Sequence, residues 1–535
     1  MTALTTHAPV LLIAVPLLGA FAAPLVGKLG RGVRNTLIGL IVLFVALLAA
    51  LLAVDVFGAG GAPTVYELGG GTFTFPLSGG QIPVRILFEV DGMSAFMGLI
   101  TALIVLTGAV FSFSYWKERS GGNLYFSLFL LLTAGIFGMQ LTGDMFNFFV
   151  FLEITSIAAA GLVGFRVWLK QSQEAGFKVM AMYTLSGLLV LLAIGLLYGQ
   201  HGHLNIATLA NSINGGLVDM IALGLLLTGL AMKAGAVPMH MWAPDAYGEA
   251  PAPTSAVLVA NSQASLYGLF RVLFTLFGVG VSASALGWIL IVLALLTIFV
   301  GVTMALIQHD LKRLIAYGAV SQIGYMMLGV GVGLARQASI IASSGVDALS
   351  DAATKLDFGL VSLQGGIFHM LNDAACVGLL FFASGVIIRA SGTRDLNRMG
   401  GLGHRMMWTS IFFAIGAVAL AGVPPFNGFA SKYLIYEASF QLSPFLAVIA
   451  VLSSILLLAV FVKAFQAAFL GPKTDATAHV SDPSIGMMVP MAALVLVIIV
   501  FGLFPGFFVD HIVTPAAKAL WLGHKAYIGA VLGGI

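Results

Sequence analysis

Charged residues are scarce in this chain, and their scarcity decides its class. Only 8% of the 535 residues are Asp, Glu, Lys or Arg, whereas 60% are hydrophobic and the mean hydropathy is +1.05. Soluble domains are nearer a quarter charged. The composition therefore predicts a polytopic membrane protein, and we expect no soluble domain anywhere in it.

Cysteine is almost missing too. Cys376 lies alone in an apolar run, so an internal disulfide or a cysteine metal cluster is excluded. No Lys or Arg precedes the first apolar stretch, which favours a retained first span over a cleaved signal peptide. His201 and His203 have a spacing that could suit a metal, but without a carboxylate neighbour we expect them to be solvated.

Signatures of bound groups are also lacking. The chain has no histidine pair at haem spacing and no nucleotide loop, and the glycines near residue 400 follow no predicted strand. We therefore expect no metal, no cofactor, no redox site in this chain and no nucleic-acid partner.

What the sequence does contain is a long series of apolar runs. Windows of about nineteen residues predict fourteen spans. They lie near 8–27, 36–57, 93–114, 124–143, 145–165, 177–199, 217–238, 253–278, 283–307, 314–334, 364–388, 408–425 with a continuation to 440, 445–470 and 487–508. The insert 335–363 is either disordered or a short surface helix. The tail 510–535 is expected to be an interfacial helix, with a fifteenth span as the alternative.

The 24 lysines and arginines are unevenly divided between the two sides of this arrangement. The odd-numbered connections hold Lys28, Arg31, Arg34, Lys117, Arg119, Arg166, Lys170, Lys178, Lys312, Arg313, Arg389, Arg394, Arg398, Arg405, Lys463 and Lys473. The even-numbered connections and the C-terminus hold Arg85, Arg336, Lys355, Lys518 and Lys525. Because cytoplasmic loops are enriched in Lys and Arg, we expect a cell inner (plasma) membrane protein with both termini outside the cytoplasm and an external loop at 55–92.

A few ionisable residues fall inside the predicted spans. A charge at the centre of a membrane helix costs roughly 2.5–3.5 kcal/mol, so such residues usually mark function. The predicted proton-relay residues are Glu153, Lys233, His369, Asp373 and Lys432. A carboxylate and an ammonium that lie close together can discharge one another as a proton arrives. The alternatives are a static ion pair between two helices and a lysine that snorkels to the interface.

Prolines interrupt two of the spans that carry these lysines. Pro238 follows Lys233 by five residues, and Pro424 and Pro425 precede Lys432. Interrupted helices at corresponding places in two halves point to internal repeats with sites at mid-membrane. The domain prediction is three N-terminal helices in 1–115, a first five-helix repeat in 116–280, a second in 281–472, and a last helix with an interfacial tail in 473–535.

Four stretches carry a family resemblance: GDMFNFFVFLEITSIAAAGLVGF, KAGAVPMHMWAPDAYGEAPAPTSAVL, HDLKRLIAYGAVSQIGYMMLGVG and GVPPFNGFASKYLIYEA. They resemble the antiporter-like subunits of respiratory complex I (NADH-quinone oxidoreductase), Mrp cation/proton antiporters and membrane-bound hydrogenases, with the D-type subunit of Mrp nearest. The resemblance implies fourteen helices, two inverted five-helix repeats and a hydrated polar axis. It pairs Glu153 with Lys233, places His369 on the axis, and ends the second half-channel at Lys432.

The sequence departs from the family pattern at the centre of that axis. Gln263 stands where the family commonly has a lysine, and Asp373 and Val377 stand where a histidine and a lysine are usual. Asn261, Gln263 and Asn372 could pass protons by hydrogen bonding, but they cannot hold a positive charge.

Three functions remain open at this point. The favoured one is a subunit that moves protons, with sodium as a second candidate ion, among other membrane subunits of an Mrp-type or complex I-like assembly in the lipid bilayer. The others are a structural subunit with a partly silenced channel and a stand-alone secondary transporter. The driving reaction is left open: hydrogen, formate or quinone chemistry, or an ion gradient alone.

Overall fold

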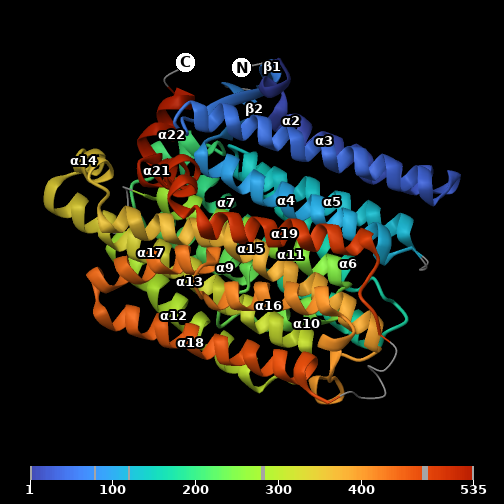
Figure 1. Ribbon diagram of the computed structural model, residues 1–535. Helices are drawn as coiled ribbons and strands as arrows, with labels where there is room; N and C mark the ends of the chain where they lie inside the picture. Colours follow the sequence, from blue (N-terminus) through green and yellow to red (C-terminus); the bar gives the residue numbers. More distant parts are fainter. Residues whose placement is uncertain (1–2, 78–79, 118–120, 279–282, 473–479, 533–535) are drawn as a thin grey trace.

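Membrane-type helices dominate the computed structural model, which describes residues 3–77, 80–117, 121–278, 283–472 and 480–532 (Figure 1). In this part of the chain, 13 helices are long and apolar enough to cross a membrane. A shorter apolar helix, α16 (Met407–Ala421), resumes after a break as α17 (Asn427–Leu442) and supplies the fourteenth predicted span. The expected polytopic helical fold is confirmed, although Arg119 and Lys473, used in the charge argument, lie outside the described residues.

The long helices cover most of the chain. They are α2 (Ala8–Val26), α3 (Arg31–Gly58), α4 (Gly92–Tyr115), α5 (Gly122–Leu141), α6 (Met145–Val163), α7 (Lys170–His201), α9 (Leu217–Ala234), α11 (Ala252–Arg271), α12 (Ala283–Ile307), α13 (Leu311–Ser344), α15 (Phe358–Ser391), α18 (Pro444–Phe465) and α19 (Ile485–Leu503). The short ones are α1 (Ala3–Thr6), α8 (Ile206–Ser212), α10 (Trp242–Glu249), α14 (Ala348–Thr354), α20 (Pro505–Phe508), α21 (Thr514–Trp521) and α22 (Gly523–Leu532). Tighter 3-10 turns occupy Gly27–Leu29, Leu396–Arg398 and Leu402–His404, and wider π turns occupy Val272–Leu276, Gln466–Leu470 and Val509–Val513.

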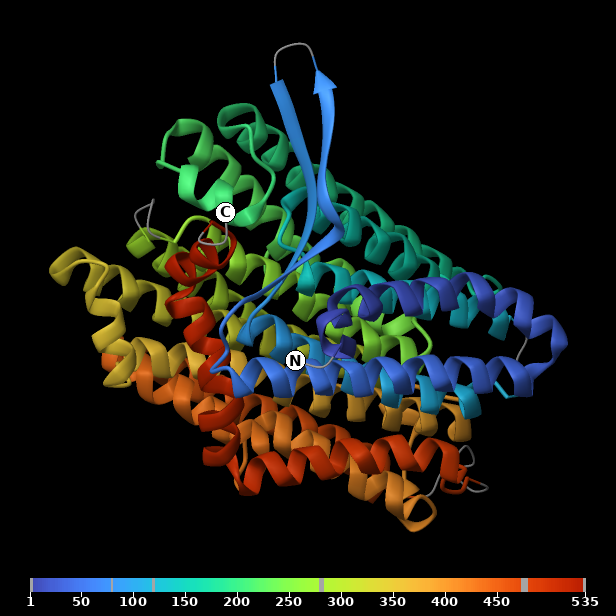
Figure 2. The same ribbon diagram turned by 90° about the horizontal axis from the view of Figure 1, so that it is seen from above.

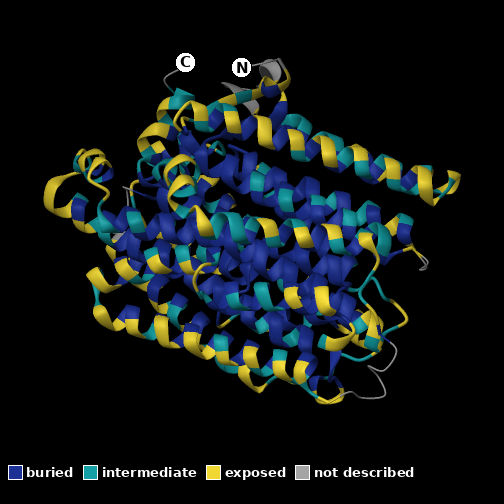
Figure 3. Cartoon of the chain, viewed as in Figure 1, coloured by how far each residue is buried: buried dark blue, intermediate teal, exposed yellow. Residues whose placement is uncertain are grey.

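Three helices form the centre of the bundle. Every residue of α11 is buried, and α13 and α15 are buried along nearly their whole apolar length. Alanine and serine recur along α11, and small side chains let neighbouring helices approach closely. The outer helices α3 and α18 instead expose Leu, Val and Ile (Figure 3). Apolar side chains on the outer helices suit contact with lipid, while the interior is mostly apolar with a smaller set of buried polar side chains.

A β-hairpin interrupts the helical pattern where only an external loop was expected. β1 (Thr64–Leu77) pairs antiparallel with β2 (Gly80–Val90), with Thr64 opposite Val90 and Leu77 opposite Gly80. Figure 2 shows this hairpin projecting beyond the helices. Alternation of polar and apolar residues in TFTF, residues 72–75, was the available strand signal. The predicted all-helical membrane fold is confirmed, and this two-stranded hairpin is the small sheet within the described residues.

The two ends of the bundle carry different connections. At one end Asp245 binds Lys178 (2.8 Å) and Arg313, and Arg394 binds Glu249 and Asp310 (2.6 Å each). The hairpin, α8, α14 and the C-terminal helices gather at the other end. This distribution keeps the predicted basic loops together on one side.

The insert 335–363 agrees with one of its two expected alternatives, whereas the tail and His201 differ from what the sequence led us to expect. The insert 335–363 is mostly helix: α13 continues to Ser344, and α14 is the short helix that was one of the two alternatives for this segment. The tail is not one interfacial helix but α20 to α22, separated by turns and packed on α4, α8 and α15. His201 is not solvated, since its Nε2 lies 2.7 Å from the Asp219 carboxylate and both side chains are buried.

Candidate functional site: a buried polar axis

Two helices break in the same way beside the buried lysines. Gly235 caps the end of α9 and Gly422 caps the end of α16, and their φ values of +91° and +87° are left-handed backbone that favours glycine. Pro238 follows the first glycine, and Pro424 and Pro425 follow the second. Because proline lacks an amide hydrogen, neither helix can simply continue through these positions. Both interruptions place helix ends, with free carbonyl groups, inside the protein.

Lys233 is fully buried and held by neutral groups. Its Nζ donates to the Leu152 carbonyl (2.5 Å) and the Ser156 hydroxyl (2.6 Å), both on α6. The same atom lies 4.7 Å from the centre of the Tyr183 ring on α7. Three helices therefore meet at one ammonium group, which cannot be snorkelling to an interface.

Glu153 follows Leu152 on α6, but its side chain does not touch Lys233. Among the described residues no N···O distance within 4.0 Å joins the two side chains. The Oε1 atom of Glu153 is buried and makes no hydrogen bond with the described part of the chain. Gly187 of α7 makes room for it, because a Cβ at that glycine would lie 1.9 Å from Oε1. The two groups are neighbours, not a closed ion pair.

Lys432 repeats the arrangement in the second half. Its Nζ donates to the Leu420 carbonyl (2.8 Å), freed where α16 ends, and to the Ser454 hydroxyl of α18 (3.1 Å). It lies 4.4 Å from the centre of the Tyr325 ring. Each lysine thus has one carbonyl, one serine hydroxyl and one tyrosine ring around it. A helix carboxyl end favours a cation, so the Leu420 carbonyl suits this position.

His369 connects Lys432 to the centre of the bundle. Its Nδ1 lies 2.9 Å from the hydroxyl of Ser431, the residue next to Lys432. Its Nε2 lies 3.1 Å from Oε1 of Gln322 on α13. One turn further along α15, Asp373 faces the same side, so the predicted pair shares a helix face.

The middle of the axis is an amide and a carboxyl group. Gln263 of α11 donates from Nε2 to Oδ2 of Asp373 (3.0 Å) and to the Met370 carbonyl (2.9 Å). Oε1 of Gln263 and Oδ1 of Asp373 are buried without a hydrogen bond to any described residue. Such atoms are where a proton or a water molecule is accommodated. Val377 is fully buried and apolar, so it carries no charge here.

Two asparagines complete the set predicted from the sequence. Asn261 donates to the Tyr183 hydroxyl (3.3 Å) and so lies next to the Lys233 site. Asn372 and Asn427 bind each other, since each Nδ2 donates at 2.9 Å to an oxygen of the other residue. Asn372 therefore fastens α15 to the start of α17, while Asn261 contacts Tyr183, whose ring faces Lys233.

Several residues that contact Lys233 and Lys432 could not be identified from the sequence. Ser156, Ser454, Tyr183 and Tyr325 are ordinary residues in apolar runs, and only the packing of different helices brings them to the lysines. Arg271 also lies inside a predicted span, at 253–278, but nothing in the sequence identifies its partner.

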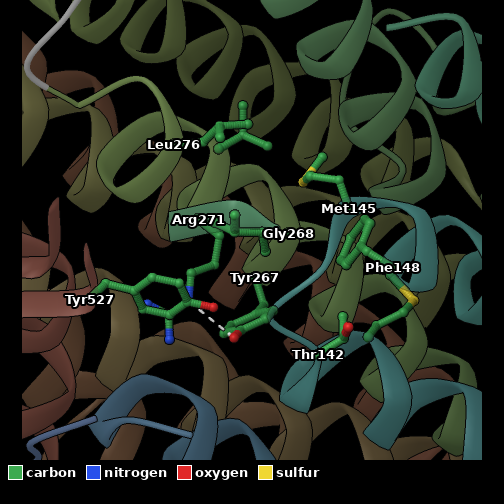
Figure 4. A pocket seen from close by; sticks show the side chains of 11 residues that line it. Thr142, Met145, Phe148, Tyr267, Gly268, Arg271, Leu276 and Tyr527 are labelled. Atoms are coloured by element: carbon green, nitrogen blue, oxygen red, sulfur yellow. Dashed lines mark hydrogen bonds between the residues drawn. The ribbon is translucent and has the colours of Figure 1, made fainter. Parts of the chain in front are cut away.

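That partner is Asp91, at the start of α4. Arg271 forms a buried ion pair with Asp91, and its Nε donates to the Tyr267 hydroxyl (3.0 Å; Figure 4). Asp91 also caps α4 by accepting from the Ser94 amide (3.0 Å). Within the described ranges no group of three or more His, Cys, Asp or Glu residues could hold a metal ion.

Comparison with known proteins agrees with this architecture. The family model described as "NADH:quinone oxidoreductase/Mrp antiporter, TM" matches residues 142–350 and 339–458. The chain belongs to the NADH:quinone oxidoreductase/Mrp antiporter family.

Individual members of this family match along most of their length. The N subunit of the NADH-quinone oxidoreductase of Desulforudis audaxviator is 31% identical over 526 residues, 94% of this chain and 96% of the relative. The D subunit of the Na(+)/H(+) antiporter of Bacillus subtilis is 31% identical over 471 residues, 86% of this chain and 89% of the relative. A component of the Mrp complex from Dietzia sp. DQ12-45-1b has a TM-score of 0.83 and 26% identity, with the whole length of both proteins covered.

Proposed function

We propose that the chain is the proton-translocating, antiporter-type membrane subunit of a multisubunit complex. Protons pass along the buried line from Glu153 and Lys233 through Asn261, Gln263 and Asp373. His369 and Lys432 continue the line, so that donors or acceptors are present at every stage. The family membership and the multisubunit setting of the structural neighbours support this role.

The surroundings of the two lysines are the observation that carries the proposal. A buried ammonium with a purely structural role is normally compensated by a carboxylate, and removing either partner is strongly destabilising. Lys233 and Lys432 instead touch carbonyl, hydroxyl and ring groups, which are neutral. The ammonium donates to the serine hydroxyl, and the neutral amine can accept from that same hydroxyl. Both protonation states therefore keep a partner, as a proton carrier requires.

One observation favours the second candidate, a structural subunit with a silenced channel. The centre of the axis is occupied by Gln263 and Asp373, and no described cation lies between Lys233 and Lys432 on α11 or α15. A neutral amide passes protons only by exchanging hydrogen bonds. The proposed function therefore requires that this neutral centre conducts.

The test uses the intact complex in sealed membrane vesicles. Proton movement is followed with a pH-sensitive dye while the complex is driven by its own reaction or by an imposed ion gradient. We expect Lys233→Ala to abolish proton movement while the subunit still co-purifies with its partners. Lys233→Arg keeps a positive charge that is not released, and we expect it to assemble and to remain inactive. Wild-type proton movement in the assembled Lys233→Ala complex would rule out the carrier role.

The membrane location and the orientation belong to the same proposal. We assign the chain to the cell membrane, with the end that carries Arg166, Lys178, Arg313 and Arg394 in the cytoplasm and the hairpin end outside. The enrichment of cytoplasmic loops in Lys and Arg supports this orientation. Protons are the proposed ion, and sodium is the second candidate because carboxylates and amides bind both.

A further inference from the structure

One face of α11 leads from the middle of the polar axis to the hairpin end of the bundle. Gln263, Tyr267 and Arg271 are spaced four residues apart, so they lie above one another on the same face of the helix. Four residues rise about 6 Å along a helix, a distance that a single water molecule between two polar groups spans. Gln263 holds Asp373 at one end of this face, and Arg271 holds Asp91 at the other.

Tyr267 joins this face to the helices beside it. Its hydroxyl donates to the Gln140 carbonyl of α5 (2.8 Å) and lies 3.0 Å from the Ser94 hydroxyl of α4. The Arg271 side chain reaches the same hydroxyl and also donates to Ser94 (3.1 Å). A hydroxyl with acceptors and donors on several sides can take up one proton and release another.

A cavity of about 20 Å³ lies beside these groups (Figure 4). Thr142, Tyr267, Arg271 and Tyr527 contribute polar groups to its lining, and Phe148 is among the apolar residues around them. A space of this size accommodates about one water molecule. The cavity lies beside Tyr267 and Arg271 at the point where α11 ends, and its lining is mainly apolar.

Glu89 is a buried acidic group near the start of α4. It lies at the end of β2, two residues before Asp91, and is 1% exposed. Both carboxylate oxygens are buried, Tyr527 and Asp91 are among the groups beside them, and Gly143 packs against the side chain. Burial, together with the neighbouring Asp91 carboxylate, raises the pKa of Glu89 to about 9. At neutral pH it is a carboxylic acid that holds a proton.

We propose that Asp373, Gln263, Tyr267 and Glu89 form an outlet that connects the middle of the axis to the hairpin side of the membrane. This inference rests on the proposed proton-translocating function. A proton released by Asp373 enters the line at Gln263. The Tyr267 hydroxyl accepts a proton from that side and releases its own towards Glu89. Glu89 gives its proton to water outside, and the carboxylate left behind takes up the one arriving from Tyr267. Arg271, fixed by Asp91, holds Tyr267 in position and keeps metal cations out of the line.

The test compares conservative variants in the intact complex in vesicles. Glu89→Gln keeps the size and neutrality of the acid but has no acidic proton to release, and Tyr267→Phe removes only the hydroxyl. Asp347→Asn is the matched control, because Asp347 is a carboxylate at the same end that binds Lys525 (2.7 Å) outside the proposed outlet. Assembly is measured by co-purification, and proton release is measured per turnover of the complex.

We expect Glu89→Gln and Tyr267→Phe to assemble and to lower proton release by about 10²-fold, the scale of a lost proton-transfer group. Asp347→Asn should behave like the wild type, and Glu89→Asp should restore part of the activity. Wild-type release in Tyr267→Phe or in an assembled Glu89→Gln complex would overturn the outlet. If Lys233→Ala still abolishes transport in that case, the proposed function stands without this outlet; if Lys233→Ala is also active, the proposed function itself fails.

Discussion

The substitution Gly187→Ala tests whether proton movement depends on where the Glu153 carboxylate lies. It adds one methyl group and leaves Glu153 itself in the chain. Gly187 lies in α7 opposite Glu153, and a Cβ built there comes within 1.9 Å of Oε1 and 3.0 Å of the carboxyl carbon. The backbone atoms around it are not in the way. In Gly187→Ala the free end of the Glu153 side chain must therefore move, while the helices can stay where they are.

The size of the effect follows from these distances. Ordinary van der Waals contact begins near 3.4 Å, so Oε1 must shift by about 1.5 Å from its present 1.9 Å separation. Proton transfer needs hydrogen-bond reach, and a misplacement of about 1 Å can reduce a rate about 10²-fold. Alanine also gains about 1 kcal/mol over glycine in a helix. We therefore expect a small gain in stability together with a loss of proton movement of about two orders of magnitude.

The assay is proton movement by the complex in vesicles, with the thermal unfolding midpoint measured on the same preparation. Gly195→Ala is the matched control, because Gly195 lies on the same helix with no atom within 4 Å of its added Cβ. It should have the same small gain in stability and wild-type transport. Normal transport in Gly187→Ala, beside lost transport in Glu153→Gln, would refute the argument that the placement of this carboxylate controls the relay.

Three further measurements test other parts of the structure. Gln263→Lys puts an ammonium beside the Asp373 carboxylate, so we expect assembly and an altered number of protons moved per turnover; failure to assemble would show that Gln263 is needed as packing. Ser350 is exposed on α14, so Ser350→Cys should react with an impermeant maleimide added outside the cell. The natural cysteine, Cys376, is buried and should not react. Reaction from the cytoplasm alone would reverse the orientation. Finally, the folded pKa of about 9 for Glu89 exceeds the ordinary value of 4.5, so the contribution of Glu89 to stability is fully present below pH 4.5 and is lost as pH rises towards 9, by about 1.4 kcal/mol per unit. Glu89→Gln should flatten this dependence in thermal unfolding, and an unchanged slope would contradict the raised pKa.

The helical spans and the lysines within them could be predicted because both signals are local. A long run of apolar residues identifies a membrane span at any position in the chain. A charged residue within such a run, such as Lys233 or Lys432, is easily recognised. The breaks were visible for the same reason, since Pro238, Pro424 and Pro425 act on their own helix. The hairpin was missed because a glycine-rich segment obscured its alternating pattern, although Phe73 and Phe75 preserve that pattern.

The partners of those charges were decided only by the tertiary structure. Ser156 reaches Lys233 from α6, Ser454 reaches Lys432 from α18, and Asp91 reaches Arg271 across 180 positions of the sequence. Serines and tyrosines are common in membrane helices, so nothing local distinguishes these from their neighbours. The sequence by itself determined a membrane bundle with ionisable groups at its centre, because hydropathy and charge belong to single residues and short runs. Which oxygen each ammonium faces depends on how distant helices pack, and that is a property of the folded chain alone.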